Sequence, residues 1–72
     1  MTLTMAPQGK HLIVQRISGK DEFRSRLAAL GFVVGADCLV VSERGKHLIT
    51  VIQNTRIAME KCLGNRIQVV LK

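Results

Sequence analysis

The 72-residue sequence has no tryptophan and no tyrosine, and Phe23 and Phe32 are its only aromatic residues. Small barrels that bind nucleic acid usually stack the bases on exposed aromatic side chains. Phe23 belongs to an apolar helical stripe and Phe32 follows the end of that helix, so we expect both in the core. The scarcity of aromatic residues argues against nucleic-acid binding. The basic charge of the chain nevertheless keeps nucleic-acid binding as an alternative to the function considered below.

Cysteine and long apolar runs are also scarce. Cys38 and Cys62 are the only thiols, too few for a disulfide scaffold. No apolar run approaches the roughly 18 residues that a membrane span requires. Residues 1–10 lack the basic start and apolar stretch of a secretory signal. We therefore expect a cytoplasmic protein with free thiols and no membrane insertion.

Motifs for catalysis and for tight metal binding are absent. No glycine-rich run ends in Lys-Ser or Lys-Thr, so the chain has no phosphate-binding loop. The candidate metal ligands are His11, Cys38, His47, Met59 and Cys62. Apart from Met59 and Cys62, no two of them have the close spacing of a zinc-binding pair. The sequence predicts a protein that is not an enzyme, with no cofactor and no high-affinity metal site.

Acidic residues are few, since five Asp and Glu oppose eleven Lys and Arg, giving a formal net charge of +6. This balance favours acidic partners, yet no run of five or six bases occurs, so a solvated basic surface is the simpler interpretation. The hydrophobic fraction of 47% is almost wholly aliphatic. It predicts a folded, β-rich structure, and the length accommodates one domain, residues 1–72.

Residues 21–30 form the one convincing helix of the sequence. Leu27 and Leu30 lie three residues apart on one helical face, and Phe23 precedes Leu27 by four residues. This spacing is typical of an amphipathic helix with its apolar stripe toward the core. We therefore expect Leu27 and Leu30 to be structural residues.

Both ends of this helix carry terminating residue types. The acidic start suits the positive end of the helix dipole, and either Ser18 or Asp21 is the expected N-cap. Gly31 is expected to close the helix with a positive φ angle. Gly35 then permits the tight turn that leads into the next strand.

Five short segments have the alternation and the β-branched residues of strands. They are residues 11–17, 37–43, 47–52, 55–59 and 67–71. The run from Arg44 to Lys46 predicts a hairpin, Asn54 predicts a tight turn, and 60–64 predicts a single helical turn. Five strands with one helix between the first and the second indicate a mainly β fold, a small SH3-like barrel.

Three segments, in chain order, resemble a known family. They are RLAALGFVVGADCLVV, NTRIAM and GNRIQV, at residues 26–41, 54–59 and 64–69. They resemble the FeoA family (ferrous iron transport protein A), whose members read roughly RLxxLGxxPGxxVxV, GSRIAL and ANRIxV. The matching residues are Leu30, Gly31, Gly35, Arg56, Ile57, Ala58, Asn65, Ile67 and Val69. Val34 stands where the family commonly has proline, and Asn54 stands at its usual glycine.

The resemblance implies a small cytoplasmic accessory or regulatory protein of ferrous iron uptake. Such a protein acts by contact with the cytoplasmic domain of FeoB, the membrane iron permease, rather than by catalysis. Family-level descriptions include transition-metal binding. A related barrel also occurs as a regulatory domain of iron-dependent transcriptional repressors, which belongs with the alternative function.

The family register also predicts a partner surface on the hairpin. The inward residues are then Cys38, Val40, Leu48, Thr50 and Ile52. The outward aliphatic residues share one face: Leu39, Val41, Ile49 and Val51. We predict that this face binds the partner and that Arg44 and Lys46 at the hairpin tip steer association. Alternatively, the helix or the N-terminal arm, with Leu3 and Met5, covers this face.

Overall fold

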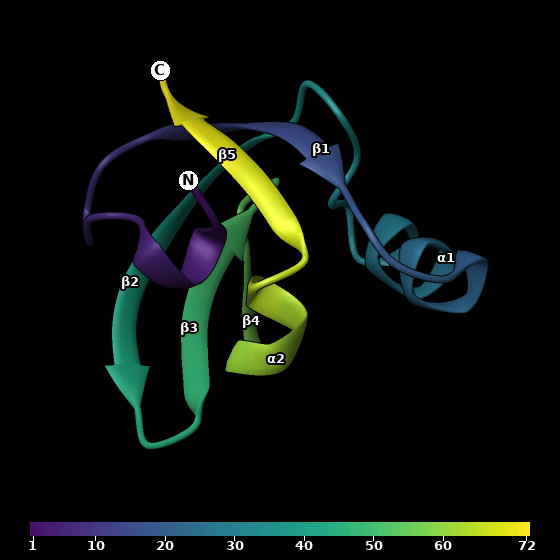
Figure 1. Ribbon diagram of the computed structural model, residues 1–72. Helices are drawn as coiled ribbons and strands as arrows, with labels where there is room; N and C mark the ends of the chain where they lie inside the picture. The colour runs from purple at the N-terminus through teal and green to yellow at the C-terminus, as the bar shows by residue number, and fades with distance from the viewer.

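Five antiparallel strands form one strongly bent sheet in the computed structural model, which describes residues 1–72 (Figure 1). In chain order the elements are η1 (Leu3–Met5), β1 (Leu12–Ile17), α1 (Asp21–Ala29), β2 (Asp37–Arg44), β3 (His47–Ile52), β4 (Thr55–Glu60), α2 (Lys61–Gly64) and β5 (Ile67–Leu71). The mainly β fold predicted from the alternating segments is confirmed. No helix combines the length and apolar character needed to cross a membrane.

The strand order is β4-β3-β2-β1-β5, so β4 and β5 are the two ends of the sheet. The short helix α2 connects these ends, and the 3-10 helix η1 packs against both α2 and β5. Gly64 allows this close approach, because a Cβ atom there would lie 2.7 Å from Thr4 Oγ1 and 2.8 Å from Leu48 Cδ1. The N-terminal segment thus helps to close the space between the ends of the sheet.

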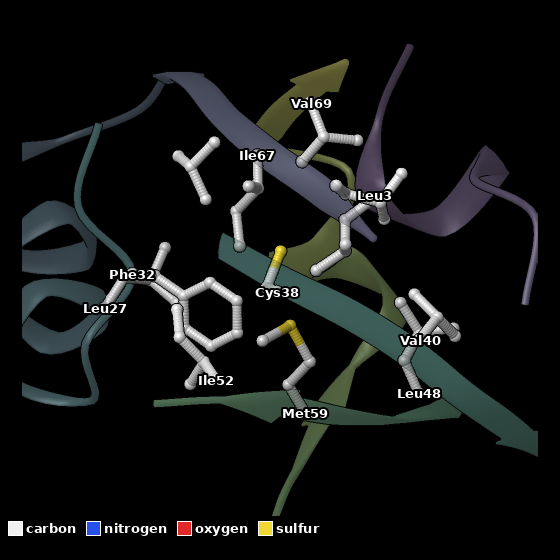
Figure 2. Packing of buried hydrophobic residues seen from close by; sticks show 12 residues of the cluster. Leu3, Leu27, Phe32, Cys38, Val40, Leu48, Ile52, Met59, Ile67 and Val69 are labelled. Atoms are coloured by element: carbon white, nitrogen blue, oxygen red, sulfur yellow. The ribbon is translucent and has the colours of Figure 1, made fainter. Parts of the chain in front are cut away.

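One hydrophobic core fills the bent sheet (Figure 2). Its members are Leu3, Leu12, Val14, Leu27, Phe32, Cys38, Val40, Leu48, Ile52, Met59, Ile67 and Val69. The predicted inward set of the hairpin is confirmed, since all five of those side chains are buried. Thr50 is the buried polar member, and its Oγ1 donates a hydrogen bond of 3.0 Å to the Ile57 carbonyl. The hydroxyl of Thr50 is therefore hydrogen-bonded although it is buried.

The helix α1 contributes less to this core than its apolar stripe predicts. Leu27 is its single buried residue, whereas Leu30 is 45% exposed, so the prediction that Leu30 is a core residue is wrong. The reason is that the chain reverses at Gly31, whose φ of +103° confirms the predicted helix end. The reversal sends the larger Phe32 side chain into the core in place of Leu30. Figure 1 shows α1 standing to one side of the sheet.

The predicted N-cap of α1 is also wrong. Lys20 occupies the N-cap position and no side chain caps the helix. Ser18 is engaged elsewhere, because its N–H and its Oγ both donate to the Arg66 carbonyl, at 2.8 and 3.3 Å. Asp21 begins the helix proper, so its carboxylate acts on the helix dipole and not as a cap. The β1–α1 turn is consequently tied to the chain just before β5.

Candidate functional site

The outer face of the β2–β3 hairpin lies on the side of the sheet opposite the core. Leu39 and Val51 are direct cross-strand partners, and Val40 and Thr50 form the adjacent inward pair. Leu39, Val51 and Ile49 are each partly exposed. The alternation of side chains therefore places these aliphatic groups together on the outer face.

A bulge changes the position of Val41 on this face. The register shifts between Val40 and Ser42, so Ser42 and not Val41 is paired with Ile49. A bulge sets two residues of one strand opposite one residue of the other. Val41 and Ser42 therefore both lie opposite Ile49, and a hydroxyl adjoins the aliphatic group.

Strand β4 extends the outer face by two residues that the sequence analysis did not include. Ala58 is the partner of Ile49, and Arg56 is the partner of Val51. Both side chains are exposed. The signal was present in the sequence, because burial of Met59 in β4 fixes Ala58 on the opposite side of the strand. The candidate surface, which we name the hairpin face, comprises Leu39, Val41, Ile49, Val51, Arg56 and Ala58.

An open hollow of about 360 Å³ adjoins the hairpin face at the end that carries the β3–β4 turn. Leu39 and Val51 line it together with His11 and Asn54. Asn54 has a φ of +64°, which confirms the tight turn predicted there, and Gln53 before it also has a positive φ of +50°. This turn leaves the aliphatic pair at the edge of an accessible depression.

The N-terminal segment does not place its predicted residues on the hairpin face. Leu3 is fully buried as a member of the hydrophobic core (Figure 2). Met5 is 74% exposed to solvent. The arm therefore contributes Leu3 to the inner side of the sheet.

The hairpin tip carries Arg44 and Lys46 on either side of Gly45, whose φ is +57°. Both basic side chains are exposed, and no carboxylate lies within 4.0 Å of either. The neighbouring Glu43 pairs instead with Lys61, at 2.9 Å. Two uncompensated positive charges thus flank the turn, where they can act on an approaching acidic surface.

The candidate metal ligands are divided between surface and core, since His11, His47 and Cys62 are exposed whereas Cys38 and Met59 are buried. His11 Nδ1 lies 3.1 Å from Asp37 Oδ1, and Lys72 Nζ lies 2.6 Å from Asp37 Oδ2. These hydrogen bonds, first to Lys72 and then to His11, hold the pKa of Asp37 below its usual value. The Asp37 carboxylate is therefore engaged by two basic groups rather than available to a cation.

The two thiols lie in different environments. Cys38 is buried, and desolvation raises the pKa of its thiol to about 11, with a smaller contribution from the charge of Asp37. Cys62 is exposed, and its Sγ lies 3.5 Å from Glu60 Oε2. Glu60 is the cross-strand partner of His47. No three His, Cys, Asp or Glu side chains gather in an arrangement that would hold a metal ion, so these residues do not fit the transition-metal site implied by the family.

A second exposed apolar region surrounds the end of α1. Leu30, Val33 and Val34 are 45%, 44% and 68% exposed. The sequence pattern does not indicate this region, because the apolar stripe of the helix predicts that Leu30 faces the core. Its one signal in the sequence is that three aliphatic residues, Leu30, Val33 and Val34, lie within the five positions from 30 to 34, beside the helix-ending Gly31.

Comparisons with known proteins agree with this geometry. A sequence model of the FeoA domain matches residues 1–71. The structure resembles the crystal structure of an iron uptake regulatory protein, FeoA, with a TM-score of 0.91 and 28% identity over 100% of this chain and 96% of that one. It also resembles the zinc complex of Stenotrophomonas maltophilia FeoA, described as an SH3 domain protein, with a TM-score of 0.79 and 29% identity over 97% and 89% of the two chains.

Two further comparisons bear on the fold. The solution structure of iron(II) transport protein A from Clostridium thermocellum gives a TM-score of 0.92 at 25% identity, over 99% of this chain and 45% of that one. A manganese-dependent transcriptional repressor has the same fold over 36% of its length, with a TM-score of 0.89 at 20% identity. No curated protein sequence matches the chain. The SH3-like architecture is confirmed, and the match over residues 1–71 shows that this chain belongs to the FeoA family.

Proposed function

We propose that this protein is a small cytoplasmic accessory factor of ferrous iron uptake that binds the cytoplasmic domain of a FeoB-type permease through the hairpin face. Membership of the FeoA family supports the iron-transport role. The observation that carries the proposed site is the cross-strand pair Leu39 and Val51, which lines an open hollow on the outer side of the sheet. The protein acts by contact and not by catalysis.

Aliphatic side chains supply the affinity of this contact. Burial of apolar surface contributes roughly 25 cal/mol per Å², so covering the hairpin face contributes several kcal/mol. Arg44, Lys46 and Arg56 surround the apolar centre with positive charge, which suits an acidic rim on the permease domain. Rim charges of this kind affect the rate of association more than the final affinity.

A pull-down against the purified cytoplasmic domain of the permease tests the proposal. The double substitution Leu39→Ser and Ile49→Ser should abolish binding, with circular dichroism to establish that the variant is folded. The matched control is Val70→Ser with Leu71→Ser, which removes two exposed aliphatic side chains of β5 far from this face in the sheet order. Full binding by the folded hairpin variant, or equal loss in the β5 control, would contradict the assignment.

The hairpin tip needs its own measurement. Reversing both charges by Arg44→Glu and Lys46→Glu should slow association and reverse the sign of its salt dependence, while dissociation changes little. Stopped-flow or surface-binding kinetics at two salt concentrations would measure this. An unchanged association rate would remove the tip residues from the proposed site.

A further inference from the structure

Gln15 and Arg16 are consecutive residues of β1, yet both are exposed and line the same hollow. Side chains alternate along a regular strand, and Leu12 and Val14 are buried, so regular alternation would direct Arg16 into the core. A bulge in the pairing with β5 shifts the register between Val14 and Arg16. It turns the Arg16 guanidinium outward, onto the surface beside Gln15.

Three hollows adjoin one another from α1 to the outer surface of β1 and β5. The first, of about 530 Å³, lies against α1 and is mostly apolar, with Ala28, Phe32 and Val33 in its wall. It shares three residues with the second hollow: Ile17, Arg24 and Val34. The second and third hollows share Gln15, Arg16 and Ser18. The third hollow is lined by polar side chains alone. We name this continuous depression, apolar at one end and basic at the other, the α1–β1 groove.

Positive charge in the groove is largely uncompensated. Arg16 has no carboxylate within 4.0 Å. Arg24 has only Asp21, at 4.0 Å, and that carboxylate is fully exposed. Asp21 is also the single acidic residue that lines any of the three hollows. Exposed pairs of this kind are weak, so both guanidinium groups remain available to an anionic ligand.

The walls of the groove are held in place. The two hydrogen bonds from Ser18 to the Arg66 carbonyl fix the β1–α1 turn. Gly19 in that turn has a φ of +117°, and the Arg66 side chain packs closely against it, with Cδ and Nη1 3.1 Å from the position that a Cβ would take. Because the groove is already ordered, it loses little conformational entropy when a ligand binds.

We propose that the α1–β1 groove binds a short acidic peptide segment of a partner protein. Carboxylates of the segment pair with Arg16 and Arg24, and a neighbouring aliphatic side chain enters the apolar hollow beside Val34. Nucleic acid is the less suitable occupant, because the groove has no exposed aromatic side chain: Phe32 is fully buried and Phe23 lies beneath Arg66. None of the residues that line the groove belongs to the hairpin face, so the inference does not depend on the proposed contact with the permease.

A titration of the full chain with a synthetic probe tests the groove directly. The probe is an octapeptide of alternating leucine and glutamate, followed through the backbone amide signals of isotope-labelled protein. Binding should shift the signals of residues 15–19, 24–28 and 33–34 and leave those of 44–46 unchanged. An octapeptide with glutamine in place of glutamate, and one with serine in place of leucine, should each bind about tenfold more weakly or worse, which is the loss expected from one good contact.

Variants that remove the same number of positive charges distinguish specific binding in the groove from general attraction to a basic protein. Arg16→Gln with Arg24→Gln should weaken the octapeptide about tenfold, whereas Arg44→Gln with Lys46→Gln, which removes the same charge, should have less than about a twofold effect. On the apolar side, Val34→Ser should weaken binding and Val70→Ser should not. All six substituted positions are exposed, and melting temperatures would establish that each variant is folded.

Several outcomes would overturn the inference. They are absence of any shift at saturating peptide, equal weakening by the two charge-matched variants, and tighter binding of a single-stranded oligonucleotide to the same residues. If the groove binds the peptide while the hairpin variants still bind the permease domain, the proposed hairpin contact alone fails. If the hairpin contact holds and the peptide binds nowhere, the groove alone fails.

Discussion

The guanidinium carbon of Arg66 lies 5.0 Å from the ring centroid of Phe23. This cation–π contact joins the start of α1 to the segment that leads into β5, although the two residues lie far apart in the sequence. Leu27 is the only fully buried side chain of α1. The Arg66–Phe23 contact is therefore a principal attachment of a helix that otherwise stands beside the sheet.

Replacing Arg66 by glutamine should loosen α1. A contact of this type at a partly exposed site is worth about 0.5–1 kcal/mol, which corresponds to a fall in melting temperature of roughly 2–8 °C for a domain of this size. Arg26→Gln is the control, because Arg26 lies on α1 itself and has no carboxylate partner. Amide exchange should accelerate in residues 21–29 more than in the strands. Equal exchange rates in the two variants would show that the contact does not hold the helix.

Gly31 should tolerate substitution poorly. Its φ of +103° lies where β-branched residues are strained, and a Cβ there would lie 3.3 Å from Gln53 Oε1. Gly31→Val should therefore cost roughly 1–3 kcal/mol of unfolding free energy. Denaturant titration would measure the loss, with Val33→Ala as a control at an exposed position of the same segment. An unchanged unfolding midpoint for Gly31→Val would contradict the assigned helix end.

Asp37 should stabilise the protein only while it is ionised. Its pKa in the folded state is lowered from 3.8 by hydrogen bonds from Lys72 and His11. A lowered folded-state pKa contributes stability that is present above the unfolded-state pKa and disappears as the pH falls through the folded-state value. The stability difference between the wild type and Asp37→Asn should consequently be constant near neutral pH and shrink below about pH 4. A difference that grows on acidification would have the wrong sign.

The two cysteines should differ sharply in reactivity. Burial raises the pKa of Cys38 to about 11, so near neutral pH its thiol is both protonated and shielded. Cys62 is exposed and should react with a thiol reagent at once, whereas Cys38 should react only after unfolding. Mass spectrometry of Cys62→Ser before and after addition of denaturant would measure this. Rapid modification of Cys38 in the folded variant would be inconsistent with its place in the core.

The sequence by itself predicted the features that depend on local chemistry. Alternation identified the five strands, and the register of the resembling family identified the inward residues of the hairpin. Gly31 marked the end of α1 because glycine alone adopts its φ without strain. The order of five short strands with one helix after the first indicated the SH3-like architecture. These features follow from side-chain periodicity and backbone preference, which act over a few residues.

Only the tertiary structure decided the features in which one segment constrains another. The bulges beside Val41 and Arg16 shift the register between two paired strands and bend the bulged strand, and each redirects a side chain that alternation alone would misplace. Leu3 enters the core because the space between β4 and β5 has to be filled, and Leu30 is exposed because Phe32 occupies the interior position. These outcomes depend on competition for one shared core volume, which no local pattern records.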